Sequence, residues 1–172
     1  MSFTGGSNCV HSFKPQLMFR FNQTSTSINN GLELHGSQTF VVTACNEVVN
    51  LSNVRTAEVE FQIYDREAMH GAVTCLATVG SLLAIGYSSG TILVYNLEVR
   101  LTDKETQGKF SASPFELAHQ FSFHKSAVTC MIFSGEGGTQ LISGSADTYI
   151  VIYDLVASTA EFKLMGHSES IT

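Results

Sequence analysis

The tetrapeptide Ala-Val-Thr-Cys occurs twice in this chain, at residues 72–75 and 127–130, and a histidine lies shortly before each copy. The likeness between the two copies continues well downstream of both. Outside an insertion that follows the earlier copy, the repeat has a period of 43 residues, which is the separation of His124 and His167. A chain with such a period folds as a series of similar units, each packed on the next one.

Each repeat consists of short apolar runs separated by turn residues. Residues 82–97, "LLAIGYSSGTILVYNL", align with residues 140–155, "QLISGSADTYIVIYDL". Runs of this length, rich in Val, Ile, Leu and Tyr, are typical of β-strands, and no window shows the 3.6-residue period of an amphipathic helix. About four strands per 40–45 residues is the spacing of a β-propeller blade. We therefore predict an all-β partial propeller with about three four-stranded antiparallel blades and the start of a fourth.

The repeat also predicts the domain boundaries. An N-terminal extension occupies residues 1–37 and contains one candidate strand, at 16–21. The incomplete propeller occupies 38–172, with units at 38–66, 67–123 and 124–165 and the start of the next unit at 166–172. A closed propeller usually has seven blades, or about 290 residues at this period, so we expect the chain to be a fragment of a longer protein. Coverage of the open faces by self-association or by another chain is the alternative.

Residues 144–155, "GSADTYIVIYDL", resemble the signature of the WD-repeat (WD40) family. That resemblance implies a buried hydrogen-bond relay in the third unit, formed by His124, Ser143, Asp147 and Tyr153. The Asp147 carboxylate would hold the imidazole in one tautomer, the other ring nitrogen would meet the serine hydroxyl, and the hydroxyl would meet the tyrosine. Such a network fixes geometry when every member is satisfied.

The chain departs from the family pattern in three places. It contains no Trp, so Tyr153 stands where the family usually has that residue. Ser89 occupies the position of Asp147 in the second unit, and Ser52-Asn53 occupies the signature position in the first. His70 lies one residue closer to its strand than the pattern requires. We therefore expect the third unit alone to hold the full relay.

Composition excludes several classes of function. The chain has 172 residues, 44% apolar and 14% charged, which suits a packed domain. Its net charge of −6 argues against a general polyanion binder, so RNA contact should be weak or indirect. The N-terminus does not read as a signal peptide, and the longest apolar stretches are too short for a membrane span. The four cysteines form no C-x-x-C pair, which is typical of reduced thiols in the cytosol or nucleus.

No enzyme, metal site or cofactor is predicted. His124, Ser143 and Asp147 have the composition of a hydrolase triad, and a hydrolase is the remote alternative. A triad serine must be exposed on a sharp turn, whereas Ser143 lies inside a predicted strand. "GEGG" (135–138) lacks the Lys-Ser/Thr of a phosphate-binding loop and is interpreted as a hairpin turn. The histidines and cysteines show no metal-ligand spacing, and no small-molecule substrate is expected.

The insertion at residues 98–120 is the most informative surface feature. It joins the third and fourth predicted strands of the second unit and contains the candidate partner-docking residues Arg100, Asp103, Lys104, Glu105 and Lys109. A segment of this composition can order when it binds a partner. The alternative interpretation is a solvated loop without a partner.

The likeness extends to one group within the WD-repeat family. His-Lys-x-Ala at 124–127, Gly-Ser-x-Asp-Thr at 144–148 and the weak first unit are similar to the N-terminal blades of tandem-propeller WD-repeat subunits of the small-subunit processome. This resemblance, over about residues 40–172, implies a non-catalytic scaffold in the nucleolus, bound to other proteins in a complex that processes precursor ribosomal RNA. The alternative is a cytoplasmic WD-repeat adaptor in ubiquitin ligation, trafficking or signalling.

Overall fold

The residues that the structure describes fold into three antiparallel sheets of four strands each. The computed structural model describes residues 26–34, 38–64, 70–97 and 115–172, with residues 26–34 and 38–39 described by their backbone alone. The first sheet comprises β1 (Thr26–Leu34), β2 (Gln38–Cys45), β3 (Val48–Asn53) and β4 (Val59–Ile63). The second comprises β5 (Val73–Val79), β6 (Leu82–Tyr87), β7 (Ile92–Asn96) and β8 (Glu116–Phe121). The third comprises β9 (Val128–Ser134), β10 (Gln140–Ser145), β11 (Ile150–Asp154) and β12 (Thr159–Leu164), with a short 3₁₀ helix, η2 (Glu136–Gly138), between β9 and β10.

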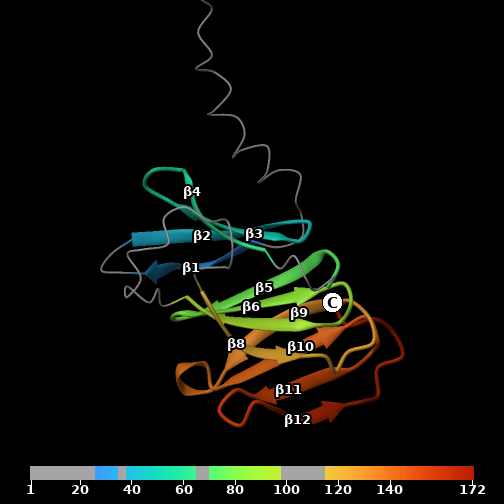
Figure 1. The fold of residues 1–172 in the computed structure, drawn as a ribbon. Helices are drawn as coiled ribbons and strands as arrows, with labels where there is room; N and C mark the ends of the chain where they lie inside the picture. The colour runs from blue at the N-terminus through green and yellow to red at the C-terminus, as the bar shows by residue number, and fades with distance from the viewer. Residues whose placement is uncertain (1–25, 35–37, 65–69, 98–114) are drawn as a thin grey trace, which may run out of the picture.

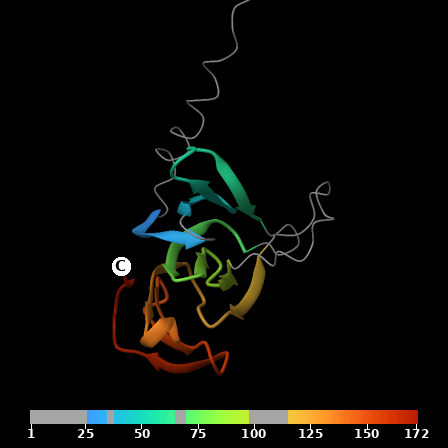
Figure 2. The same cartoon turned by 90° about the vertical axis from the view of Figure 1, so that its left-hand side faces the viewer.

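The arrangement confirms the predicted all-β blades. Within every sheet, strands that follow one another in sequence are hydrogen-bonded neighbours. The sheets are stacked in chain order, with the second between the other two (Figure 1). The first strands of successive sheets are in contact: β5 contacts both β1 and β9. Figure 2 shows the same stack from the side.

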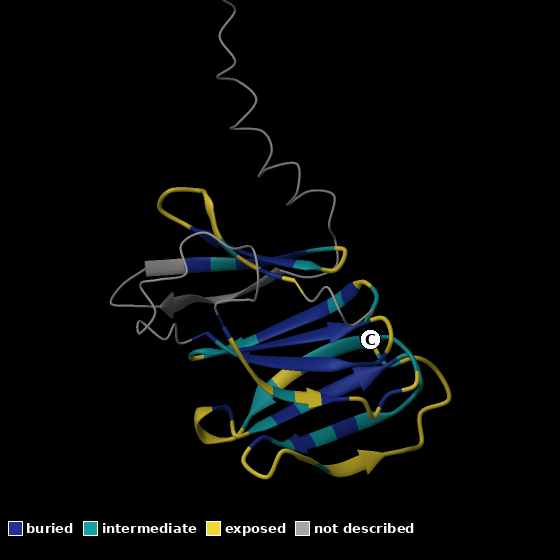
Figure 3. Ribbon diagram, in the orientation of Figure 1, coloured by how far each residue is buried: buried dark blue, intermediate teal, exposed yellow. Residues whose placement is uncertain are grey.

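Side chains alternate between the two faces of a strand, and the second sheet is apolar on both faces, so it packs between the other two sheets. Leu83 and Ile85 point toward the first sheet and belong to the apolar cluster between these two sheets. Ala84 and Val94 belong to the cluster shared with the third sheet. All four side chains are buried, and β6 and β7 are each buried at every position but one (Figure 3). A strand with two buried faces reads as a continuous apolar run, as "LLAIGY" does.

The repeated Ala-Val-Thr-Cys motif leads into β5 and β9, the first strands of the second and third sheets, and its side chains contact the next strand of the same sheet. Val73 is fully buried, and the hydroxyl of Thr74 donates to the carbonyl of Gly86 on the neighbouring strand at 3.1 Å. The Cys75 Sγ lies 2.6 Å from the place a Cβ would take on Gly86, so only glycine allows this approach. In the third sheet, the same places are taken by Val128, Thr129, Cys130 and Gly144, with a Thr129–Gly144 hydrogen bond of 3.0 Å.

Two boundaries differ from the sequence-based prediction. The first sheet begins at Thr26, twelve residues before the predicted start at 38. Residues 26–34, "TSINNGLEL", carry apolar alternation only at Leu32 and Leu34, but β1 pairs with β2 through backbone groups, which need no particular side chain. The predicted candidate strand at 16–21 lies outside the described residues.

The predicted insertion at 98–120 is too long at its C-terminal end. Residues 116–120 belong to β8, which pairs with β7 from Ile92↔Phe121 to Asn96↔Glu116. The sequence "ELAHQF" mixes polar and apolar residues and does not show a strand pattern. The reason is that β8 lies at the edge of its sheet, where most of its side chains are exposed. Of the rest of the insertion, Phe115 is buried, and residues 98–114 lie outside the described residues.

The part of the chain that the structure describes contains no helix long and apolar enough to span a membrane.

Candidate functional site: a buried histidine relay

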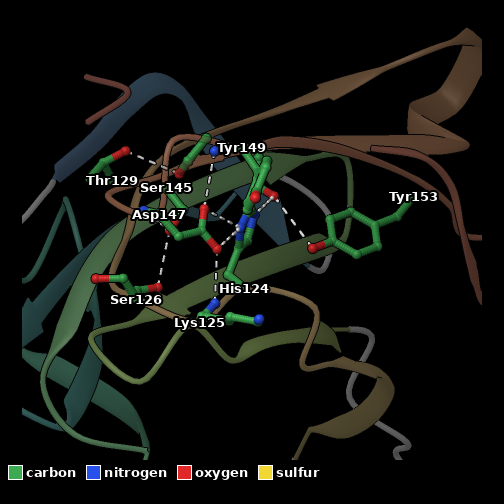
Figure 4. A network of polar contacts seen from close by, with 10 residues as sticks. His124, Lys125, Ser126, Thr129, Ser145, Asp147, Tyr149 and Tyr153 are labelled. Atoms are coloured by element: carbon green, nitrogen blue, oxygen red, sulfur yellow. Dashed lines mark hydrogen bonds and ion pairs between the residues drawn. The ribbon is translucent and has the colours of Figure 1, made fainter. Parts of the chain in front are cut away.

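The four residues of the predicted relay come from two strands, the turn between them and the connection that precedes β9. His124 lies in the connection from β8 to β9, Ser143 lies on β10 and Tyr153 on β11, and Asp147 lies in the turn between these last two strands. Figure 4 shows the side chains converging beneath this turn. The β10–β11 hairpin therefore brings three members together, and the chain entering β9 supplies the histidine.

The contacts run in one line from carboxylate to phenol. The His124 Nδ1 lies 3.2 Å from both carboxylate oxygens of Asp147, and Nε2 lies 2.7 Å from the Ser143 Oγ. An ionised carboxylate only accepts hydrogen bonds, so Nδ1 of the neutral imidazole carries the hydrogen and Nε2 accepts from the serine hydroxyl. The Ser143 Oγ and the Tyr153 Oη are 3.5 Å apart, beyond the usual range for two hydroxyls, so this last link is weak.

Asp147 also organises the turn in which it lies. Its Oδ1 accepts from the backbone N–H of Tyr149 at 3.1 Å, and its Oδ2 accepts from the backbone N–H of Lys125 at 2.8 Å. The second bond fixes the residue that follows His124. One carboxylate therefore holds both the hairpin turn and the incoming loop (Figure 4).

Sequence reasoning missed a second serine that supports the relay. The Ser145 Oγ accepts from the backbone N–H of Asp147 at 3.1 Å and lies 3.1 Å from the carbonyl of Ser126, to which it donates. The local signal was present, since Ser-x-Asp favours a turn in which the hydroxyl bonds to the backbone two residues later. The backbone contacts of Lys125 and Tyr149 leave no comparable signal, because any residue type can make them.

The relay is closed to solvent. His124, Ser143 and Tyr153 are 6%, 1% and 0% exposed. Burial lowers the pKa of the His124 imidazole, against the opposing effect of the Asp147 carboxylate. Burial alone would raise the pKa of Asp147, but hydrogen bonds from the Lys125 and Tyr149 N–H groups and from His124 outweigh it, so that pKa lies below its usual value. Burial raises the pKa of Tyr153 to about 12.

This geometry suits structure better than nucleophilic chemistry. The short His124–Ser143 contact is the one a hydrolase would need, but the hydroxyl lies in the middle of β10 with no exposed surface for a substrate to reach. A nucleophile must face its substrate with the base behind it. The buried set can hold a loop in place.

The lowered pKa of His124 predicts a pH dependence of stability. A histidine in the unfolded chain has a pKa of about 6.5. Below that pH it is protonated more fully than His124 in the folded protein, so protonation favours the unfolded state. The free energy of unfolding should fall from about pH 7 to pH 5, and the fall should be smaller in His124→Gln. Denaturant melts across this range measure it. His119→Gln is the comparison variant, because burial also lowers the pKa of His119, and it measures how much of the fall comes from outside the relay. An unchanged pH dependence in His124→Gln would contradict this role.

The second sheet keeps the turn but not the relay. Ser89 takes the place of Asp147, and its Oγ accepts from the backbone N–H of Thr91 at 3.3 Å, as Asp147 does from Tyr149. The His70 ring packs against the Tyr87 ring at 5.2 Å between centroids, and the His70 carbonyl accepts from the Ser89 N–H. Hydroxyl and backbone contacts therefore hold this turn in the described residues.

The first sheet has a different set of polar groups. Asn53 accepts from the backbone N–H of Arg55 and donates to the Glu60 carboxylate at 2.7 Å. Ser52, at the position of Tyr153, is 5% exposed, and its Oγ is the buried side-chain oxygen or nitrogen without a hydrogen-bond partner among the described residues.

The remaining predicted sites are placed as follows. The candidate docking residues Arg100, Asp103, Lys104, Glu105 and Lys109 lie outside the described residues. Across the described ranges, no group of three or more His, Cys, Asp or Glu side chains could hold a metal ion. The three cysteines described, Cys45, Cys75 and Cys130, are free thiols, and burial raises the pKa of Cys75 to about 12.

Comparisons with known proteins agree with this architecture. Residues 115–154 match the family model "WD domain, G-beta repeat", which spans β8 to β11 and includes the whole relay. None of the curated protein sequences compared matches the chain.

Solved structures share the fold at low sequence identity. A chain from the crystal structure of the mitotic checkpoint complex is 21% identical with a TM-score of 0.60, covering 78% of this chain and 36% of its own length. The structures of U3-55K and of the RRP9 WD40 repeats are each 19% identical with a TM-score of 0.60; each covers 76% of this chain, and the matches cover 37% and 36% of their own lengths. The chain thus spans little more than a third of the structures that it matches. A WD repeat of the G-beta type occupies residues 115–154, and the three sheets have the fold of the WD-repeat propellers.

Proposed function

We propose that the protein is a non-catalytic scaffold that binds other proteins in a multi-subunit complex. The observation that carries this proposal is the burial of the His124–Ser143–Asp147 set, whose hydroxyl is 1% exposed. The polar residues that could form a catalytic centre are used instead to hold the turns and loops at the end of the sheets. Rigid strands with fixed loops are a suitable platform for binding. One of the similar structures is itself a complex, the mitotic checkpoint complex.

The finer proposal is a nucleolar role in small-subunit ribosome biogenesis, within a complex that processes precursor ribosomal RNA. It is supported by the sequence likeness at residues 124–127 and 144–148 and by the weak first unit. U3-55K and the RRP9 WD40 repeats are among the structures that share the fold. With a net charge of −6, contact with RNA is expected through protein partners. The charged residues of the 98–114 segment are the proposed docking site for one of them.

A tagged full-length protein should concentrate in the nucleolus and co-purify with precursor ribosomal RNA. Imaging and RNA recovery from the purified complex test the two parts separately. Alanine at Arg100, Lys104 and Lys109 should reduce the recovered partners, because it removes the charges of the docking segment. A matched variant with alanine at the exposed Arg55, Lys125 and Lys163 should not. A diffuse cytoplasmic signal would contradict the ribosomal role and support the adaptor alternative.

A further inference from the structure

The β11–β12 turn of the third sheet is joined to the edge strand of the second sheet by a side-chain hydrogen bond. The Ser158 Oγ lies 2.9 Å from the His119 Nδ1, although the two residues are 39 positions apart in the chain. Ser158 directly precedes β12, and His119 lies on β8. Neither residue belongs to the His124 relay, so the relay does not account for this contact.

The His119 imidazole is connected to the apolar packing between the two sheets. Its ring stacks on Phe121 with 9° between the ring planes, and Phe121 stacks on Tyr153 with 4.5 Å between the ring centroids. Phe121 and Tyr153 are both buried. A charge placed on Ser158 would therefore act beside the joint between the second and third sheets.

The Ser158 hydroxyl lies on an exposed segment. Residues 156–159 are all exposed, and every residue of β12 except Ala160 is exposed as well. β12 is an edge strand that pairs with β11 alone. Such a strand can open locally without unfolding of the whole sheet. An enzyme that binds its substrate as a short extended segment can therefore reach Ser158.

The sequence after Ser158 carries a charge that one class of kinase recognises. In Ser158-Thr159-Ala160-Glu161, a carboxylate follows three residues after the serine. Acidic-directed serine/threonine kinases select this spacing, because a basic site beside their catalytic centre binds the carboxylate. Within the ranges that the structure describes, no other serine or threonine has Asp or Glu at this distance.

We propose that Ser158 is a phosphorylation site for an acidic-directed serine/threonine kinase, and that His119 holds the phosphate. In this reaction the Ser158 oxygen attacks the γ-phosphorus of a nucleoside triphosphate. A new O–P bond forms, the bond to the nucleoside diphosphate breaks, and the hydroxyl proton passes to the kinase. The phosphoserine carries about 1.5 to 2 negative charges at pH 7.

The charges around the turn favour His119 as the partner of this phosphate. Asp154 and Glu161 lie on the two strands that flank the turn, and both are acidic. The ammonium group of Lys163, also on β12, lies 3.7 Å from the centre of the Tyr149 ring. The His119 Nδ1 already lies within hydrogen-bond distance of Ser158. It can therefore donate to a phosphate oxygen, and the phosphate in turn favours the imidazolium.

Phosphorylation is tested on the complete polypeptide as made in the cell, incubated with a purified acidic-directed kinase and Mg²⁺–ATP. Mass spectrometry should locate the phosphate on Ser158, also in protein isolated with phosphatase inhibitors. Glu161→Gln should slow the modification about tenfold or more, because the kinase loses the carboxylate that it recognises. Glu136→Gln is the matched control, since Glu136 is an exposed carboxylate in the β9–β10 connection and should leave the rate unchanged.

Other sites of modification would overturn the assignment. Thr102 and Ser113 also have a glutamate three residues later, but they lie outside the described residues. Phosphate found on these two residues and not on Ser158 would contradict the proposal. An unmodified chain, or a rate that is the same in Glu161→Gln, would contradict it as well.

The role of His119 is measured separately, by deuterium exchange at the imidazole Cε1 across a series of pH values. This exchange, followed by mass spectrometry, gives the pKa of individual histidines in a large protein. Burial lowers the pKa of His119 in the unmodified protein. On phosphorylation its proton-dissociation constant should fall about tenfold or more, so that its pKa rises. His167 is the exposed internal control and should keep its pKa. An unchanged His119 would show that it does not hold the phosphate.

Discussion

Gly90→Ala is expected to lower the free energy of unfolding by about 2–5 kcal/mol. Gly90 lies in the β6–β7 turn with φ of 89°, a left-handed conformation that any other residue adopts at a cost. An added Cβ would lie 2.5 Å from the His124 carbonyl oxygen and 2.8 Å from that of Ser126. Both oxygens belong to backbone, so the clash is relieved only by moving the loop that holds the relay histidine.

Gly137→Ala separates the two causes of that loss. Gly137 also has a positive φ, 69°, but nothing lies within 4 Å of the place a Cβ would take there. Its substitution should therefore cost only the conformational term, about 1 kcal/mol. Denaturant melts of the two variants measure the difference. Equal losses would mean that the β6–β7 turn does not press on the His124 loop, and that the second and third sheets are coupled elsewhere.

Asp147→Ala should cost about 1–3 kcal/mol, because it leaves three hydrogen-bonding groups without their acceptor. These groups are the His124 Nδ1–H and the backbone N–H groups of Lys125 and Tyr149. His124→Ala breaks the same network. The loss in the double variant should therefore be smaller than the sum of the single losses, with a coupling of about 0.5–3 kcal/mol.

Ser89→Ala is the matched control for this pair of variants. Ser89 occupies the equivalent turn position, and among the described residues its hydroxyl bonds to Thr91 alone, so its replacement should cost about 0.5 kcal/mol or less. Additive losses for His124→Ala and Asp147→Ala would contradict a single network. If Asp147→Ala left stability unchanged and abolished a hydrolytic activity, the triad interpretation would replace the structural one.

Much of the relay could be predicted from the sequence because its spacing is local. Ser143, Asp147 and Tyr153 lie on one hairpin, and strand alternation with a tight turn places them on one side of it. His124 is fixed relative to β9 by only three intervening residues. The weak Ser143–Tyr153 link was also foreseeable, since a phenol places its oxygen farther out than an indole places its N–H.

The support around the relay could not be predicted in the same way. Asp147 bonds to the backbone of Lys125, a contact between a turn and a loop 22 residues earlier in the chain. The sequence carries no trace of such a bond, since the donor is a backbone N–H. β1 could not be predicted for the same reason, because its pairing with β2 depends on backbone groups rather than on a pattern of side chains.

The sequence by itself determined the strands, their period of 43 residues, the four-stranded sheets and the residues of the relay. These features depend on local alternation, turn chemistry and repetition, which are written along the chain. Only the tertiary structure decided which faces are covered. The second sheet is buried on both sides, whereas Ile132 and Phe162 on the third remain exposed. Similar apolar patterns lie either in a core or at the surface, because burial depends on the neighbouring sheet and not on the strand itself.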